Sequence, residues 1–209
     1  SEQKRTIEEE IFNRMKDHPK FAILASSKRL NFIQGLLHQT LMQTTNALQK
    51  QALALETKPW MTEVVFGTSG NYPIHIPIGH NQSIHLRGKI DRIDLLQSDN
   101  GIYNGIIDYK SSEQKFEIAK LIAGVQIQLL TYLKVSEEII RGEKGVIPTP
   151  LEAAYIHVHN PKFSVKEVPT EEKFNQEWTK AFKHRGVINS DEIAKLNPEL
   201  VETSKSNVL

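Results

Sequence analysis

The chain contains no cysteine. This absence excludes disulfide bonds, thiolate zinc sites, cysteine-ligated iron–sulfur clusters and cysteine nucleophiles. A metal ion bound here must therefore rest on carboxylate, histidine, carbonyl and water ligands, a set that suits magnesium, manganese or calcium. The phosphate-binding loop of ATPases is missing too, because no glycine-rich stretch ends in Gly-Lys-Ser or Gly-Lys-Thr.

An excess of one charge and a long apolar run are also missing. Lys and Arg number 26 against 25 Asp and Glu, so the formal net charge is only +1. If the protein binds a nucleic acid, it must do so through a local strip of basic residues rather than through an overall positive charge. The polar start and the lack of any long apolar segment argue against a signal peptide and a membrane span. We therefore expect a cytoplasmic protein without a membrane partner.

The 209 residues fit one domain. Apolar residues at three- and four-residue steps predict helices over 4–17, 29–55, 115–141 and 171–184. β-Branched and aromatic residues predict strands at 62–66, 74–76, 84–96, 103–109 and 152–158. The order predicts a mixed α/β domain with a mostly antiparallel sheet, and we expect a partly ordered tail over roughly 190–209.

Acidic residues of one predicted hairpin form the main candidate site. Asp108 and Lys110 are two apart on a strand, so their side chains share a face. If the hairpin closes at Asp99-Asn100-Gly101, Asp91 lies roughly level with Asp108. Two carboxylates can hold a divalent ion, while a lysine beside them can orient water and stabilise charge growing on a phosphate. Glu63, on the preceding strand, could supply a third carboxylate.

A structural interpretation competes with this one. The pattern acid, any residue, lysine is common, and Glu171-Glu172-Lys173 is a second example that is typical of a solvated helix start. The context of Asp108 favours the catalytic interpretation. It follows a run of buried-type residues, where a lone carboxylate is costly without a partner or a metal ion.

Two helices carry further candidates. Gln128 and Tyr132 are four apart on an apolar helix, so they share a face. Such a pair needs hydrogen-bond partners, either inside the core or at the metal site and the DNA backbone. His38, between Leu37 and Leu41, is by its pattern more often a packed residue than a metal ligand.

The segments 88–94, 106–112 and 128–133, in this order and spacing, resemble the RecB-type branch of the PD-(D/E)XK nucleases. The match is closest to the C-terminal nuclease domain of AddB- or RexB-type subunits of bacterial ATP-dependent helicase–nucleases, and it extends from about residue 29 to the end. The resemblance implies an α/β PD-(D/E)XK core with a mixed central sheet flanked by helices. It also implies that residues 1–209 are a single nuclease domain, the C-terminal part of a larger subunit.

The resemblance further implies a metal centre. Its ligands would be His38, Asp91, Asp108 and the main-chain carbonyl of Tyr109. Mg²⁺ would be the natural ion, with Mn²⁺ or Ca²⁺ possible in the same site. Many AddB-type domains carry four cysteines that bind an iron–sulfur cluster. Since this chain has none, no cluster is expected, as in the RexB-like branch.

The same resemblance makes Lys110 the catalytic lysine. Glu63 matches the upstream acid of the family, and Gln128 and Tyr132 match its motif on the helix after the core. These residues, with Asp91 and Asp108, form the expected catalytic set.

The function implied is that of a divalent-metal-dependent deoxyribonuclease. It would be an exonuclease acting on a single DNA strand within a helicase–nuclease complex, together with a partner of AddA or RexA type, in recombinational repair of double-strand breaks. One alternative is a catalytically silent DNA-binding or scaffold domain, which need not keep Asp91, Asp108 and Lys110. Another is a stand-alone 5′ single-strand exonuclease, which the match in the late strand disfavours.

Overall fold

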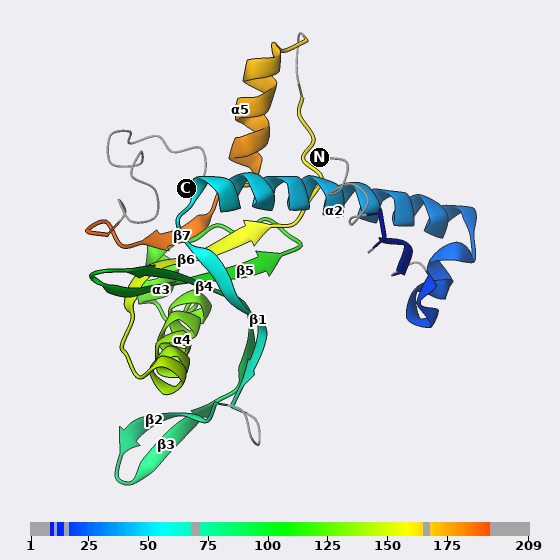
Figure 1. The fold of residues 1–209 in the computed structure, drawn as a ribbon. Coiled ribbons are helices and arrows are strands. Elements are labelled where there is room, and N and C mark those ends of the chain that lie inside the picture. The colour runs from blue at the N-terminus through cyan, green and yellow to red at the C-terminus, as the bar shows by residue number, and fades with distance from the viewer. Residues whose placement is uncertain (1–8, 11, 15–16, 68–71, 165–167, 193–209) are drawn as a thin grey trace.

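A computed structural model describes residues 9–10, 12–14, 17–67, 72–164 and 168–192 of the chain (Figure 1). Much of the predicted helix over 4–17 and nearly all of the predicted tail over 190–209 lie outside these residues. Within the described part, no helix is both long enough and apolar enough to cross a membrane.

A mixed five-stranded sheet with the order β1-β4-β5-β6-β7 forms the centre of the fold. Its strands are β1 (Lys58–Phe66), β4 (Gly88–Ser98), β5 (Gly101–Lys110), β6 (Thr149–His157) and β7 (Arg185–Ile188). All neighbours pair antiparallel except β5 and β6, which run parallel. A parallel pair needs a long crossover, and helices α3 (Ile118–Ile122) and α4 (Gln128–Lys144) lie within it. The predicted mixed sheet with flanking helices is confirmed.

Helices cover both faces of this sheet (Figure 1). On one face, Leu48 of α2 (Lys28–Ala54) packs against Ile107 and Ile156. On the other, α4 buries Leu129 and Ile139 in the main core cluster. Two more helices, η1 (Pro19–Ala25) and α5 (Glu171–Ala181), flank α2. The sheet is therefore buried on both sides, as its apolar strands require.

Alternation along β5 determines which residues face which helix. Asn104 donates a hydrogen bond to Ser136 of α4 at 2.7 Å, so the even-numbered residues of β5 face α4. Ile107 packs with α2, so the odd-numbered residues face α2. Asp108 and Lys110 therefore lie on the α4 face, and Tyr109 lies on the α2 face.

Two of the sequence-based boundaries are wrong. The strand predicted over 84–96 is two strands in different sheets, β3 (Gln82–Leu86) and β4. Strand β3 pairs with β2 (Ile74–Gly79) in a separate hairpin. The helix predicted over 115–141 is a loop, the short α3 and then α4, interrupted around Gly124 with its φ of +72°. Both breaks depend on packing that periodicity does not report.

Candidate active site

The candidate site lies where the pairing of β4 with β5 stops. The last paired residues are Arg92 and Ile107. If this register is continued by one residue, Asp91 stands opposite Asp108, as the hairpin count predicted. Beyond this last pair, the side chain of Asp91 replaces a backbone acceptor: its Oδ2 accepts a hydrogen bond from the backbone N–H of Tyr109 at 2.8 Å. The strand end thus presents two facing carboxylates.

The Asp108 carboxylate is deeply buried, with only 3% of the residue exposed. Burial raises its pKa, the ammonium of Lys110 lowers it, and the charge of Asp91 raises it, so that the net pKa stands above the ordinary 3.8. Lys110 Nζ lies 2.6 Å from Asp108 Oδ2. A buried carboxylate beside a second one is costly, and nearby positive charge offsets that cost.

Lys110 is held in place from α4. Its Nζ donates to Oε1 of Gln128 at 3.1 Å, and Nε2 of Gln128 donates to the hydroxyl of Tyr132, also at 3.1 Å. The ammonium also lies 5.4 Å from the ring centroid of Tyr155 on β6. The polar pair on the apolar helix therefore has its partners in this site rather than elsewhere in the core.

Glu63 lies on β1 beside Asp91 in the β1–β4 register. Its backbone has a φ of +57°, and its side chain is 65% exposed. The carboxylate forms an ion pair with Lys89 rather than reaching Asp108. Lys89 has its pKa raised mainly by Glu63 and to a smaller extent by Asp91. Sequence reasoning missed Lys89, although a basic residue two positions before Asp91 was a visible signal.

The structure does not bring His38 together with the two carboxylates. The imidazole of His38 packs against the ring of Phe12, with 4.2 Å between centroids. Among the described residues, no three His, Asp or Glu side chains are close enough together to hold a metal ion. Asp91 and Asp108 are adjacent, whereas the third predicted side-chain ligand lies apart from them.

Two buried atoms bear on whether these residues fit a metal ion. Asp108 Oδ2 and His38 Nε2 are both buried, and neither has a hydrogen-bond partner in the described part of the chain. The contact of Asp108 with Lys110 is an ion pair without hydrogen-bond alignment. Carboxylate oxygens and an imidazole nitrogen are suitable donors for Mg²⁺ or Mn²⁺. The two adjacent carboxylates therefore suit a divalent cation, whereas His38 lies apart from them among the described residues.

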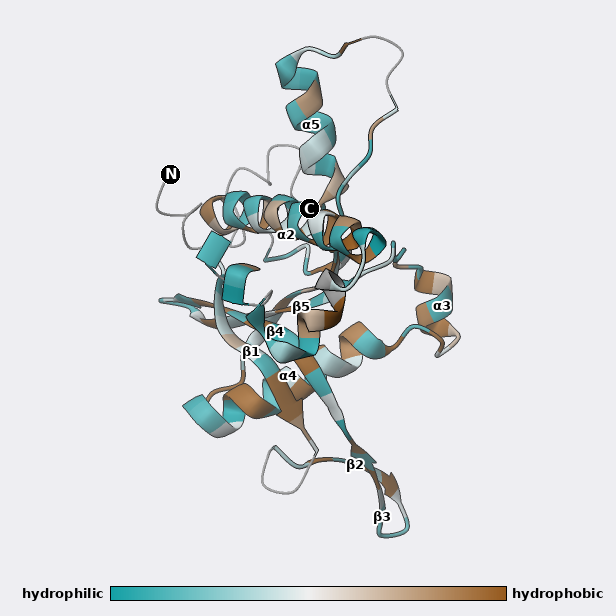
Figure 2. Cartoon of the chain, turned by 90° about the vertical axis from the view of Figure 1, so that its right-hand side faces the viewer, coloured by the Kyte–Doolittle hydropathy of each residue, from teal (hydrophilic) through white to brown (hydrophobic). Residues whose placement is uncertain are grey.

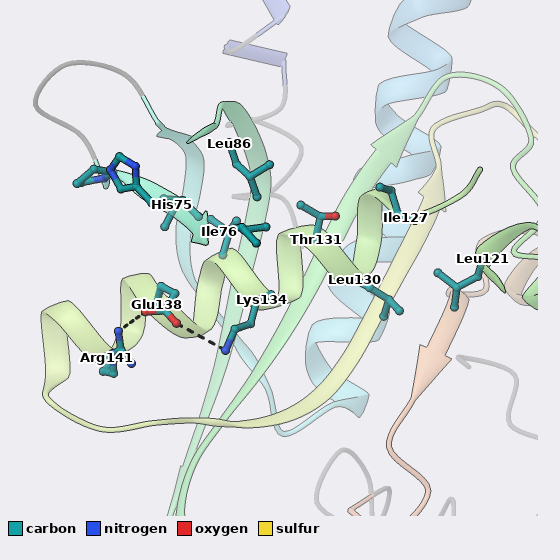
Figure 3. Close-up of a pocket in the computed structure, with 13 residues that line it drawn as sticks. His75, Ile76, Leu86, Leu121, Ile127, Leu130, Thr131, Lys134, Glu138 and Arg141 are labelled. Carbon is teal, nitrogen blue, oxygen red and sulfur yellow. Dashed lines mark hydrogen bonds and ion pairs between the residues drawn. The ribbon is translucent and has the colours of Figure 1, made fainter. Parts of the chain in front are cut away.

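A cavity of about 620 Å³ lies between the β2–β3 hairpin and α4 (Figure 3). Its walls include Ile76 and Leu86 of the hairpin and Leu130 and Lys134 of α4. In Figure 2, where the ribbon is coloured by hydropathy, the projecting hairpin and α3 both include hydrophobic residues. None of the predicted site residues lines this cavity, so it is not where the chemistry of Asp108 would take place.

Comparison with known proteins gives concordant matches. The family model of the PD-(D/E)XK nuclease superfamily matches residues 1–204. The chain is 32% identical over 199 residues to the B-type subunit of the ATP-dependent helicase/deoxyribonuclease of Latilactobacillus sakei, and 33% identical over 189 residues to that of Enterococcus faecalis. Each match covers 88% of this chain but only 16% of the relative. The corresponding protein of Listeria monocytogenes is 33% identical, with 90% of this chain covered.

Proposed function

Because this chain belongs to the PD-(D/E)XK nuclease superfamily, we propose that it is a divalent-metal-dependent deoxyribonuclease with its active site at Asp91, Asp108 and Lys110. The observation that carries the proposal is the geometry of the strand end. Two carboxylates face each other there, and the Lys110 ammonium lies 2.6 Å from one of them. Members of this superfamily are generally dependent on divalent metal ions.

The chemistry divides among the side chains of the site. Asp91 and Asp108 would hold the divalent ion, with the carbonyl of Tyr109 and the imidazole of His38 as further ligands. When bound, the ion supplies Lewis-acid chemistry that acidifies water and offsets charge on the phosphate. Lys110 orients the attacking water and stabilises the negative charge that grows on the phosphoryl oxygens.

The remaining site residues support this arrangement. Gln128 holds the ammonium of Lys110, and Tyr132 in turn fixes the amide of Gln128. The side chain of Lys89 is half-exposed, and the charge of Asp91 contributes to raising its pKa. A charged, accessible ammonium beside the site is placed to bind a substrate phosphate. Glu63 would regulate how far Lys89 is free to do so. Mg²⁺ is the proposed ion, with Mn²⁺ or Ca²⁺ able to occupy the same donors.

The relatives are named as one of the subunits of an ATP-dependent helicase/deoxyribonuclease, and this chain matches about a sixth of their length. We propose that the chain acts in such a complex, in the cytoplasm, together with a helicase partner of AddA or RexA type. Its substrate would be a single DNA strand at a double-strand break, digested as an exonuclease for recombinational repair. A net charge of +1 gives little attraction for DNA. Delivery of the strand by a motor would supply the missing local concentration.

End-labelled single-stranded DNA, incubated with Mg²⁺ or Mn²⁺ and in parallel with a chelator, tests the proposal. Asp108→Ala and Lys110→Ala should each lower the cleavage rate by at least about 100-fold. Glu171→Ala and Lys173→Ala are the matched controls, because they change the same sequence pattern at the start of α5. Normal activity in both site variants would refute the assignment. Binding of the strand without cleavage by the wild type would instead indicate a silent domain.

A further inference from the structure

The end of β5 has few backbone contacts on its β4 side. Pairing with β4 stops at Arg92 and Ile107, while pairing with β6 continues as far as Lys110. Two side-chain hydrogen bonds from β4 extend the contact by two residues. Both reach Tyr109: Asp91 Oδ2 accepts from its N–H at 2.8 Å, and Arg92 Nη1 donates to its hydroxyl at 3.1 Å.

Arg92 is itself rigidly held. Its Nε lies 2.6 Å from Oδ1 of Asp94, and its Nη2 lies 2.5 Å from Oδ2, so the guanidinium and the carboxylate form a two-pronged pair. The side chain of Arg92 is 12% exposed and that of Asp94 is 1% exposed. A planar fork bound at two points has little freedom left to rotate. The remaining nitrogen of the guanidinium, Nη1 of Arg92, therefore points toward the hydroxyl of Tyr109 in a fixed direction.

Asp94 is anchored in the middle of the sheet. It stands in one cross-strand row with Gly105 and Glu152. Any side chain at Gly105 would crowd this row, because a Cβ there would lie 3.1 Å from Cγ of Glu152 and 3.7 Å from Cβ of Asp94. Glu152 is fixed in turn by His184, whose Nδ1 lies 2.9 Å from its Oε2. Arg92 thus connects the buried centre of the sheet to its catalytic edge.

The stability of the sheet does not by itself explain a buried ion pair at this position. Apolar side chains of similar volume would commonly stabilise a sheet as well or better, because they avoid the desolvation of two charges. Apolar side chains, however, could not donate to the hydroxyl of Tyr109. The contact with Tyr109 is therefore the feature that gives the Arg92–Asp94 pair a specific role.

We propose that Arg92 is a positioning residue of the nuclease site. Anchored by Asp94, it holds the hydroxyl of Tyr109, which keeps the β5 end in place so that the carboxylates of Asp91 and Asp108 stay beside each other. Arg92 touches neither metal nor substrate. The inference rests on the proposed function, since it assigns these carboxylates to metal binding.

Tyr109→Phe is the sharpest test, because it removes one hydroxyl and leaves the backbone N–H and carbonyl of residue 109. Loss of such an outer contact typically weakens metal binding or activity by about 10-fold or more. We expect Mn²⁺ affinity, measured by calorimetry, to fall by about that factor, and kcat on single-stranded DNA to fall while KM stays constant. Tyr72→Phe is the matched control, since it removes a tyrosine hydroxyl bonded to Glu143 instead.

A readout that needs neither metal nor activity is hydrogen exchange at the amide of Tyr109 in the metal-free chain. If Arg92 positions the strand end, Tyr109→Phe should speed exchange of this amide more than of the amides of Ile106 and Ile107. Arg92→Lys keeps the charge beside Asp94 but loses the fork, and should act in the same way. The double variant should lose no more Mn²⁺ affinity and amide protection than Arg92→Lys alone, because both changes break the same hydrogen bond, that from Arg92 to the hydroxyl of Tyr109.

The outcomes separate the two proposals. Two results would overturn the positioning role and leave only a structural one. The first is a loss of Mn²⁺ affinity in the double variant equal to the sum of the two single losses. The second is a lower melting temperature with unchanged Mn²⁺ affinity and unchanged exchange at the amide of Tyr109. If the wild type binds Mn²⁺ but cuts no DNA, the proposed function fails. The calorimetric and exchange measurements would then still decide the role of Arg92.

Discussion

Lys110 Nζ donates a hydrogen bond to Oε1 of Gln128 at 3.1 Å, across the boundary between β5 and α4. Gln128 is the first residue of α4. The direction of the ammonium is therefore set by the start of a helix that follows the strand by a long connection. This contact places the amide of Gln128 in the proposed site rather than in the core.

Gln128→Leu should lower kcat about 10-fold or more, because an outer contact that orients a catalytic group typically contributes that much. The leucine keeps the volume but cannot accept from Lys110. The rate is measured on single-stranded DNA at saturating Mg²⁺. Gln176→Leu is the control, since that glutamine is exposed on α5 and its amide bonds within the helix, to Glu172. Equal rates for the two variants would contradict a role for Gln128.

His38→Ala tests the proposed third metal ligand. Its Nε2 is buried and lacks a hydrogen-bond partner among the described residues. We expect Mn²⁺ affinity by calorimetry to fall at least about 10-fold, and the increase in melting temperature on adding the ion to shrink. His75→Ala, in the β2–β3 hairpin, is the control. An unchanged affinity in the His38 variant would remove this residue from the site.

Gly186→Ala should destabilise the sheet at β7. A Cβ there would lie 1.9 Å from the backbone oxygen of Ala153, and backbone cannot move aside easily. We expect a loss of about 2–3 kcal/mol in the free energy of unfolding, at the upper end for overpacking. Gly142→Ala is the opposing control in α4, where a Cβ meets no atom within 4 Å. That change should stabilise the protein by about 0.5–1 kcal/mol. Urea unfolding of both variants measures these changes. A Gly186→Ala variant more stable than the Gly142→Ala variant would contradict the prediction.

His157 should make stability depend on pH. Burial lowers its pKa below the ordinary 6.5, and the neighbouring charge of His159 lowers it further. The unfolded chain then binds this proton more readily than the folded one, so the free energy of unfolding decreases as pH falls below 6.5. His157→Asn should flatten that slope in urea midpoints measured at about pH 7.5, 6.5 and 5.5. His80→Asn, in the exposed hairpin turn, should leave the slope unchanged.

The hairpin that carries the site was predictable because its signals are local. Ser98 to Gly101 form the turn, and strict alternation after it assigns Asp108 and Lys110 to one face. Counting outward from the turn places Asp91 level with Asp108, and the register agrees. The pairing of Lys110 with Asp108 follows from the same two-residue spacing. The family resemblance added the ligand role of His38, which neither the pattern nor the structure supplies.

Tertiary structure alone decided the contacts between distant segments. The pairing of Lys110 with Gln128, the parallel register of β5 with β6, and the buried contact of Glu152 with His184 each join separate elements. Periodicity reports which face of an element is buried, but not which neighbour covers it or where an element breaks. That choice depends on how the whole chain packs, because each buried polar group must find its partner in three dimensions. Arg92 illustrates the limit. Its spacing of two residues from Asp94 allows an ion pair along the strand, but only the fold shows that this pair is buried and that Arg92 also reaches the hydroxyl of Tyr109.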